Sequence, residues 1–320
     1  MISDFLEKLS RHAAVACGNF ERIFQNTDSL TPLPGQTVQL VREVNREDAD
    51  IDKIDNMLTA TPEIAAHILR MVNSAALGVP REIKDVRHAI TMLGMRRIRQ
   101  LITSVSVMNA LPQPSEQLFD RHTFWADSLL TALLAWTFSR RAFPGYEEEV
   151  FICSLLSEMA IPVLLVDWEA YYRPVLAEWE EDERRLSEIE QAHFGWDHGQ
   201  AGSWLAEQWN LPKEMVSFIG VHSLSINSLE RHELVETPAV VLCLAARFPS
   251  MLKKKDINLK PAASQTASML PMSGAELAAG VTEIEEHYEA MREMLSLPEA
   301  SVSHRLQALY DAFNEVSEEA

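Results

Sequence analysis

Apolar residues recur every three or four positions along most of the chain, and this pattern limits the fold more than any other feature of the sequence. Such spacing places apolar side chains along one face of a helix, whereas a half-buried strand needs strict alternation. Residues 64–72 follow the helical pattern, and no convincing series of alternating strands lies between turn signals elsewhere. The sequence therefore predicts an all-α protein.

Breaks in the helical pattern divide the chain into parts. Pro112 and Pro114 end one helical stretch, and all 7 tryptophans lie beyond them, which indicates a second core. We expect a two-lobed domain over 20–250, with lobe 1 at about 20–112 and lobe 2 at about 115–250. Around it we expect an N-terminal helix over 1–19, a weakly periodic connector over 251–275 and acidic C-terminal helices over 276–320.

Capping residues and helix breakers set the expected helix ends. Thr61 as N-cap and Pro62 at the first position begin one helix, because the N–H that proline lacks would have no partner there. Gly94 separates a helix over 86–93 from one over 95–108. Two long helices, over 119–138 and 147–167, are expected to pack at the centre of lobe 2, and the acidic run 178–190 is interpreted as a solvated helix face.

Composition excludes several classes of function. The chain has 28 Lys and Arg against 47 Asp and Glu, so a net charge of −19 excludes a protein that coats nucleic acid through its whole surface. Only 11 glycines occur and no Gly-rich phosphate loop is present, which argues against a nucleotide-binding sheet. Cys17, Cys153 and Cys243 are far apart in apolar surroundings, as in reduced buried thiols, and no leader or membrane segment is evident, so we expect a cytoplasmic protein.

Several short motifs resemble, in order and spacing, those of the HDOD family, the HD-related output domains of bacterial signalling proteins. They are Leu33-Pro34, TPEI at 61–64, LRMVNSA at 69–75, AITMLGMRRI at 89–98, FWADS at 124–128, CSLLSEM at 153–159, WDHGQAG at 196–202 and WNLP at 209–212. The resemblance covers roughly residues 20 to 225. It implies a multi-helix fold in two lobes and a role in signal transduction.

Relatives of that family, the HD-type phosphohydrolases, hold metal ions with His and Asp side chains. By this resemblance, Asp127 stands where a histidine is expected, and Ser157-Glu158 stands where a His-Asp pair is expected. His198 and His222 occupy positions at which such relatives have histidines. A serine hydroxyl is a poor ligand for a divalent metal, so we expect a degenerate site with no metal, no cofactor and no catalytic residue.

Two interpretations of these remaining polar residues stay open. In one, Asp127, Glu158, His198 and His222 converge on a metal, and the protein is a divergent phosphohydrolase of a nucleotide or cyclic nucleotide. In the other, Asp127 and Glu158 are partly buried groups that neighbouring serines or the histidines satisfy, and His198 caps the helix that begins near residue 199.

Residues 70–99 form a basic strip in an otherwise acidic chain. Its candidate partner-binding residues are Arg87, Arg96, Arg97 and Arg99. The helices on either side of Gly94 also suggest a helix-turn-helix that contacts DNA through Arg96 and Arg97, but an acidic protein would repel DNA, and arginines on one face often pair with local carboxylates. We therefore expect protein partners and no nucleic acid.

Asn73 and Ser74 end their helix just before a turn. We interpret the pair as structural, joining the helix end to the neighbouring lobe, with a place in a small-molecule groove as the alternative. Taken together, these features lead us to expect a non-catalytic signalling module that contacts partner signalling proteins. The groove between the lobes is then available to a partner helix, a nucleotide or another small ligand.

Overall fold

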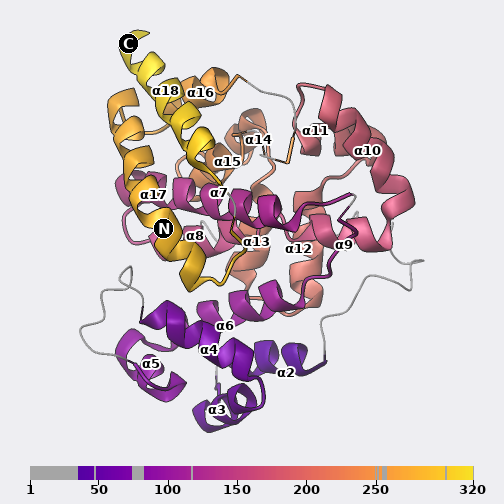
Figure 1. The fold of residues 1–320 in the computed structure, drawn as a ribbon, viewed down its shortest axis with the longest axis vertical. Helices are drawn as coiled ribbons and strands as arrows, with labels where there is room; N and C mark the ends of the chain where they lie inside the picture. Colours follow the sequence, from indigo (N-terminus) through magenta and orange to yellow (C-terminus); the bar gives the residue numbers. More distant parts are fainter. Residues whose placement is uncertain are drawn as a thin grey trace.

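The computed structural model describes residues 35–319, apart from 47, 74–82, 117, 249, 251, 254–257 and 300. Within these ranges every regular element is a helix and no strand occurs, which confirms the all-α prediction. Figure 1 shows a smaller group of helices, α2 to α6, beside a larger group formed by the rest of the chain. The expected helix over 1–19, Cys17, Leu33-Pro34 and Ser74 lie outside the described residues.

Lobe 1 consists of short helices around a small apolar core. They are α2 (Gly35–Val44), α3 (Ile51–Thr59), α4 (Pro62–Val72), α5 (Val86–Leu93) and α6 (Met95–Ala110). Ile54, Ile68 and Ile102 lie in this core with no exposed surface. Gly94 separates α5 from α6 and has a φ of 84°, a backbone conformation that residues other than glycine rarely adopt. The predicted break is therefore confirmed.

Lobe 2 packs around the pair α7 and α8. Its helices are α7 (Arg121–Ala142), α8 (Glu147–Leu155), α9 (Ala160–Asp167), α10 (Glu169–Glu181), α11 (Leu186–Phe194), α12 (His198–Gln208), α13 (Lys213–Val221), α14 (Ile226–Arg231) and α15 (Ala239–Ala245). α12 packs on α13 and on α9, and α15 covers α7. Cys153 and Cys243 are free and buried here, as the sequence indicated, and burial raises the pKa of Cys243 to about 12.

The expectation of one continuous helix over 147–167 is wrong. α8 ends at Leu155, α9 begins at Ala160, and the residues between them form turns. Pro162 explains the interruption, because in a continuous helix its ring would clash with the carbonyl of Glu158 and it has no N–H to donate. In the first turn of α9 the same proline is tolerated.

The C-terminal extension covers lobe 2. It contains α16 (Lys260–Met269), α17 (Gly274–Met294) and α18 (Ser303–Glu319), so the C-terminal helices are confirmed, whereas the connector expected over 251–275 contains a helix. That helix was missed because its sequence is polar, with only Ala263 and Thr266 fully buried. α17 packs against α7, where Arg140 and Arg141 pair with glutamates of α17 at 2.7 Å.

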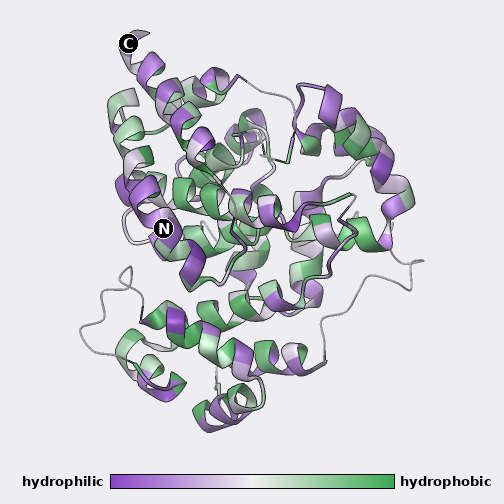
Figure 2. Ribbon diagram, viewed as in Figure 1, coloured by the Kyte–Doolittle hydropathy of each residue, from purple (hydrophilic) through white to green (hydrophobic). Residues whose placement is uncertain are grey.

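Lobe 1 meets lobe 2 where α6 packs on α8, and it meets the C-terminal extension where α17 contacts α4. Figure 2 shows apolar residues on the inward-facing sides of these helices. A cavity of about 330 Å³ lies at this junction, lined mostly by apolar residues of α4, α6, α7, α8 and α17. Glu147–Asp167 is apolar and long enough to cross a membrane, but 89% of its 18-residue apolar window is buried within the protein, as in a core segment.

Candidate functional site

Glu158 lies in the turn between α8 and α9, at the centre of lobe 2. The interruption before Pro162 directs its side chain toward the ends of α12 and α13, and the side chain keeps 27% of its surface exposed. Its neighbour Ser157 is buried, and the Ser157 hydroxyl donates to the carbonyl of Ser154 at 2.8 Å. Only one residue of this pair therefore points into the site.

His198 is the first residue of α12 and is held by a buried carboxylate. Asp197 is the N-cap of that helix, and its side chain accepts from the Gln200 amide. Glu190, from α11, is fully buried; its Oε2 contacts the Nδ1 of His198 at 2.6 Å and accepts from the His198 backbone N–H at 2.8 Å. With Nδ1 fixed in this way, the Nε2 of His198 lies 3.2 Å from the Oε2 of Glu158.

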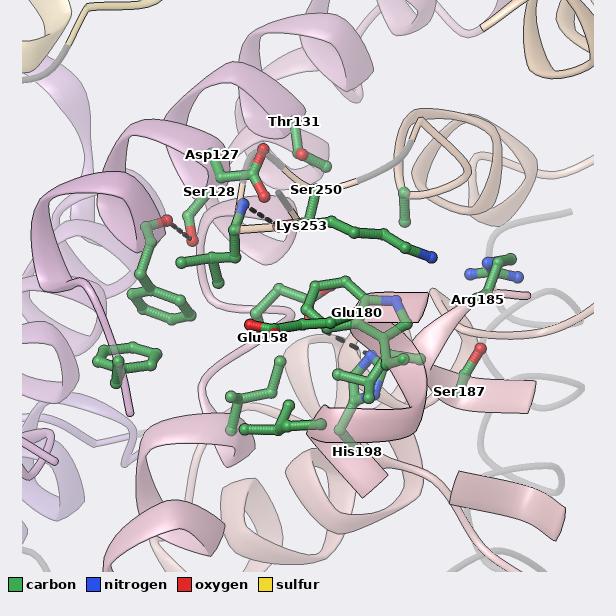
Figure 3. Close-up of a pocket in the computed structure, with 18 of the residues that line it drawn as sticks. Asp127, Ser128, Thr131, Glu158, Glu180, Arg185, Ser187, His198, Ser250 and Lys253 are labelled. Atoms are coloured by element: carbon green, nitrogen blue, oxygen red, sulfur yellow. Dashed lines mark hydrogen bonds and ion pairs between the residues drawn. The ribbon is translucent and has the colours of Figure 1, made fainter. Parts of the chain in front are cut away.

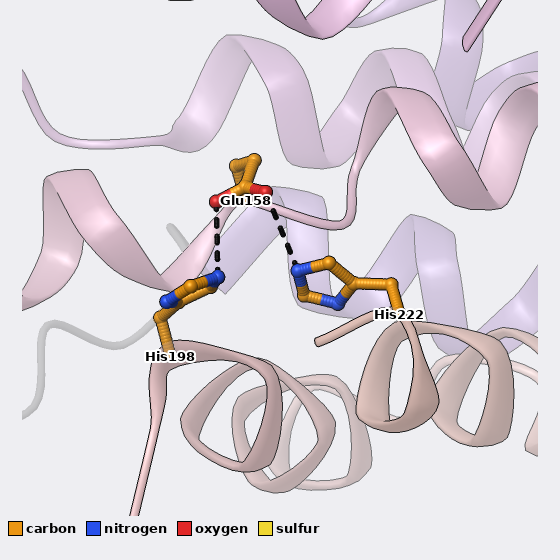
Figure 4. A group of neighbouring side chains, drawn as sticks. All are labelled: Glu158, His198 and His222. Atoms are coloured by element: carbon orange, nitrogen blue, oxygen red, sulfur yellow. Dashed lines mark ion pairs between the residues drawn. The ribbon is translucent and has the colours of Figure 1, made fainter. Parts of the chain in front are cut away.

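His222 follows α13 and faces Glu158 from the other side. Its Nδ1 donates to the carbonyl of Ile219 at 2.6 Å, which leaves Nε2 as the atom that faces the site. That Nε2 is buried, and it lies 3.3 Å from the Oε1 of Glu158. Figure 4 shows the carboxylate between the two imidazoles.

Opposite charges meet in this Glu–His cluster, which we define as Glu158, Glu190, His198 and His222. Burial disfavours the charged form of His198, but the carboxylates of Glu190 and Glu158 outweigh it and raise the pKa of His198 to about 10. Burial likewise opposes ionisation of Glu158, yet the neighbouring His198 and His222 lower its pKa to about 2. At neutral pH the cluster therefore holds an imidazolium between two carboxylates.

The donor atoms of this cluster fit a single divalent metal ion. Glu158, His198 and His222 offer ligand atoms that all lie within 4.8 Å of one another, the one such group among the residues that the structure describes. Both imidazoles also have their Nδ1 fixed by an oxygen acceptor, which is the outer support that metal-binding histidines usually have. Two imidazoles and one carboxylate suit Zn, Fe or Mn, and such an ion would polarise a phosphate oxygen and activate water.

Asp127 is not part of this group of three, so only three of the four residues in the metal-binding interpretation come together here. It lies on α7 and lines the same cavity as Glu158 and His198. Its charge acts instead on the C-terminal helices: it favours the charged form of Arg305, whose pKa burial lowers, and it contributes after burial to raising the pKa of Tyr288 to about 12. α17 packs on α7 and α18 packs on α17, which brings these groups toward Asp127.

The basic strip is paired within the protein. Arg96 contacts Glu149 at 2.9 Å, Arg97 contacts Glu148, and both glutamates belong to α8. Elsewhere in the strip, Arg87 pairs with Asp52 and Asp55 of α3, and Arg99 donates to the carbonyl of Arg46 at 3.1 Å. Of the two interpretations of these arginines, DNA contact and local pairing, the structure shows local pairing for Arg87, Arg96 and Arg97.

Asn73 acts as a clamp within lobe 1. Its side chain donates to the carbonyls of Leu69 and Ile83 at 2.8 and 2.7 Å, and its Oδ1 accepts from the Ile83 N–H at 2.6 Å. The role is structural, as expected, but the partner belongs to the same lobe and not to the neighbouring one.

Glu190 and Tyr172 belong to the site and escaped the sequence analysis. Glu190 ends the acidic run 178–190, which was interpreted as solvated, yet it has no exposed surface and accepts a hydrogen bond from the Tyr172 hydroxyl. The available signal was local: Ile189 and Glu190 both fall on the buried side of α11, together with Leu186. A carboxylate on such a face needs a partner, and His198 provides it.

Several solved structures of other proteins have a fold similar to that of this chain. A candidate phosphohydrolase of Shewanella amazonensis SB2B is 22% identical with a TM-score of 0.64, covering 85% of this chain and 97% of its own. An HDOD domain protein of unknown function from Geobacter sulfurreducens is 19% identical with a TM-score of 0.60, covering 92% and 98%. A candidate signal transduction protein of Marinobacter aquaeolei VT8 is 16% identical with a TM-score of 0.57, covering 91% and 66%.

Sequence comparison gives the family. An uncharacterized protein of Treponema pallidum (strain Nichols) is 22% identical over 230 residues, which are 71% of this chain and 44% of that protein, so the chain spans less than half of its length. The model of the HDOD domain matches residues 30–224, more than half of the chain. The protein therefore belongs to the HDOD family, as its motifs indicated.

Proposed function

We propose that this protein is a non-catalytic signal-transduction module that acts through contacts with partner proteins. The observation that carries the proposal is the internal pairing of the Glu–His cluster. Glu158 lies between two imidazoles, and Glu190 holds one of them. The two other positions of the expected metal site are diverted, since Ser157 bonds to the backbone and the charge of Asp127 acts on the C-terminal helices.

The cluster supports a structural role because it joins separate elements of lobe 2. Its side chains come from the turn after α8, from α11, from the start of α12 and from the end of α13. Buried ionic groups need partners, and removal of one partner from such a network costs several kcal/mol. A paired cluster thus stabilises the relative position of these helices without any chemical step.

The junction between the lobes supports contact as the mode of action. Lobe 1, lobe 2 and α17 all line its cavity, with Met71 and Leu93 on one side and Met291 and Met294 on another. Methionine side chains adapt to different partners. A protein that binds across this junction would contact both lobes at once. A change in one lobe would then alter the surface that the partner contacts on the other lobe.

Two assays on the purified protein test this function. Hydrolysis of mono- and diphosphoesters with Mn²⁺, Fe²⁺ or Zn²⁺ should not exceed the rate with metal alone. Affinity capture from the native bacterium, repeated with Leu93→Lys, should lose a partner that the unchanged protein retains, whereas Glu230→Ala on exposed α14 should retain it. Metal-dependent turnover that Glu158→Ala abolishes would overturn the proposal, as would a partner set that Leu93→Lys leaves unchanged.

A metal-dependent phosphohydrolase is the second candidate. The geometry of the two imidazoles favours it, because both have a fixed Nδ1 and direct Nε2 at Glu158. Protein purified without chelator would then carry about one equivalent of metal, and His222→Ala would lose it. DNA binding has less support, since Arg96 and Arg97 already pair with glutamates of α8.

A further inference from the structure

A cavity of about 310 Å³ opens beside the Glu–His cluster, within lobe 2 and the segment that follows it. Figure 3 shows Asp127, Ser128 and Thr131 of α7 at one end, Glu158 and His198 in the middle, and Arg185 at the other end. Arg247, just after α15, also lines the cavity. The lining therefore has carboxylates on α7 and on α10, and it also carries three guanidinium groups, of Arg184, Arg185 and Arg247.

Arg247 is poorly satisfied by the protein. Its Nη1 is buried and has no hydrogen-bond partner. Burial lowers the pKa of Arg247, and the charge of Arg185 lowers it further, with Glu188 acting in the opposite direction. Arg247 is thus a partly buried cation that lies beside a second cation.

Arg185 lines the same cavity as Arg247. Its Nη1 donates to the carbonyl of Ser223 at 3.1 Å, which is a neutral acceptor and leaves the positive charge of the guanidinium uncompensated by that bond. A buried donor without a partner costs about 1–3 kcal/mol, and more for a charged group. Arg247 is in this state, and an anion in the cavity would give its Nη1 the missing partner.

We propose that Arg185 and Arg247 form a binding site for the phosphate group of a small phosphorylated ligand. Guanidinium groups match phosphate oxygens with paired N–H donors, so one phosphate would satisfy the free Nη1 and remove the repulsion between the two side chains. The cavity volume lies at the lower end of the range for small-molecule sites, which excludes a folded partner as the occupant. This inference goes beyond the proposed contact function.

The rest of the lining suits the body of such a ligand. Trp179 and Phe248 provide aromatic surface in the same cavity, and Asp127 at the far end would accept hydrogen bonds from amino groups. A nucleoside monophosphate has these parts: a phosphate, a flat ring and exocyclic amino groups. The net charge of −19 makes non-specific binding of anions unfavourable, so any binding that is observed points to a specific site.

Calorimetry with pyrophosphate and with AMP, at low ionic strength and with EDTA present, tests the site in the full chain. EDTA separates binding by the arginines from binding by a metal at the Glu–His cluster. We expect saturable one-site binding by the unchanged protein, and AMP should bind more tightly than pyrophosphate if the aromatic lining contributes. Arg247→Met, which keeps the apolar stem, should weaken binding at least tenfold.

Thermal unfolding distinguishes a ligand site from a structural arginine. Without ligand, Arg247→Met should melt at the same or a higher temperature than the unchanged protein, because an unpaired cation is removed. The control Arg173→Met, an exposed arginine of α10 that pairs with Glu169, should leave binding unchanged. The proposal is overturned if neither probe binds at millimolar concentration, if Arg247→Met binds equally well, or if Arg247→Met melts at a lower temperature and loses binding only by unfolding.

Discussion

The basic strip and the Glu–His cluster are both groups of paired charges, but they differ in exposure. In the strip, Arg97 and Glu148 keep 47% and 38% of their side chains exposed, and Arg96 keeps 78% although its partner Glu149 keeps only 8%. In the cluster, Glu190 is fully buried and His198 keeps 6%. Water screens the first kind of pair and weakens it, whereas the second kind must be complete to be tolerated. Equal numbers of ion pairs therefore contribute very unequally to stability.

Removal of Glu190 should have the largest effect. Glu190→Ala leaves His198 and the Tyr172 hydroxyl without their shared acceptor in a buried region, and we expect a loss of about 3–5 kcal/mol in the free energy of unfolding. Urea denaturation measures this loss. Glu230→Ala, at an exposed position of α14, should change stability by less than about 0.5 kcal/mol. A loss below 1 kcal/mol for Glu190→Ala would contradict the expected difference in stability between the buried cluster and the basic strip.

The pH dependence of stability should come next. Because folding raises the pKa of His198 from 6.5 to about 10, its contribution is complete below pH 6.5 and is lost as the pH rises through about 10. Glu158, lowered from 4.5 to about 2, contributes above pH 4.5 and loses that contribution as the pH falls toward 2. With a chelator present, we expect roughly 2–4 kcal/mol to be lost between pH 6.5 and 10.

His198→Gln is the variant that checks the assignment of this pH effect. Its stability should fall much less between pH 6.5 and 10 than that of the unchanged protein, because glutamine does not titrate. Equal slopes in the two proteins would show that another group is responsible.

A neutral clamp in lobe 1 tests hydrogen bonds that involve no charge. Asn73→Ala removes the hydrogen bonds that join the end of α4 to Ile83, and we expect a loss of about 1–2 kcal/mol in chemical denaturation. Asn73→Asp should be nearly as destabilising, because it keeps the acceptor for the Ile83 N–H and loses the donor. If Asn73→Ala cost as little as an exposed ion pair, these hydrogen bonds would contribute no more to stability than a pair of the basic strip.

The basic strip should show the smallest effect. Arg97→Ala should reduce the free energy of unfolding by less than about 1 kcal/mol, and the reduction should shrink further in 0.5 M salt because both partners are exposed. Thermal melts at two salt concentrations check both statements. A loss of 2 kcal/mol or more would mean that this exposed pair stabilises the protein as much as a buried pair does, which contradicts the expected difference.

Periodicity and breakers were enough to predict the class of fold and many helix ends. Gly94 separates two helices and Pro62 begins one, as expected from backbone chemistry alone. The interruption at 156–159 was missed because the apolar pattern continues through it, although Pro162 carried the signal. The helix within 251–275 was missed because its residues are polar.

The candidate site was predictable only in part, because it depends on contacts between distant helices. Glu158, His198 and His222 were singled out by their motifs, yet nothing local shows that they meet while Asp127 does not. Their meeting requires α12 to pack on both α9 and α13. Burial of Glu190 and the unpaired Nη1 of Arg247 are also products of packing, which a single sequence does not display.

Close packing of α17 on α7 affects how the protein can be made in the cell. A side chain at Gly280 would meet Thr137 Cγ2 at 2.5 Å, so these helices approach too closely for any larger residue there. Thr137 leaves the ribosome about 140 residues before Gly280, a delay of roughly 7–28 s at ordinary rates of translation. During that interval one face of α7, the central helix of lobe 2, is not yet covered by α17. Chaperones and neighbouring chains can then bind to that face.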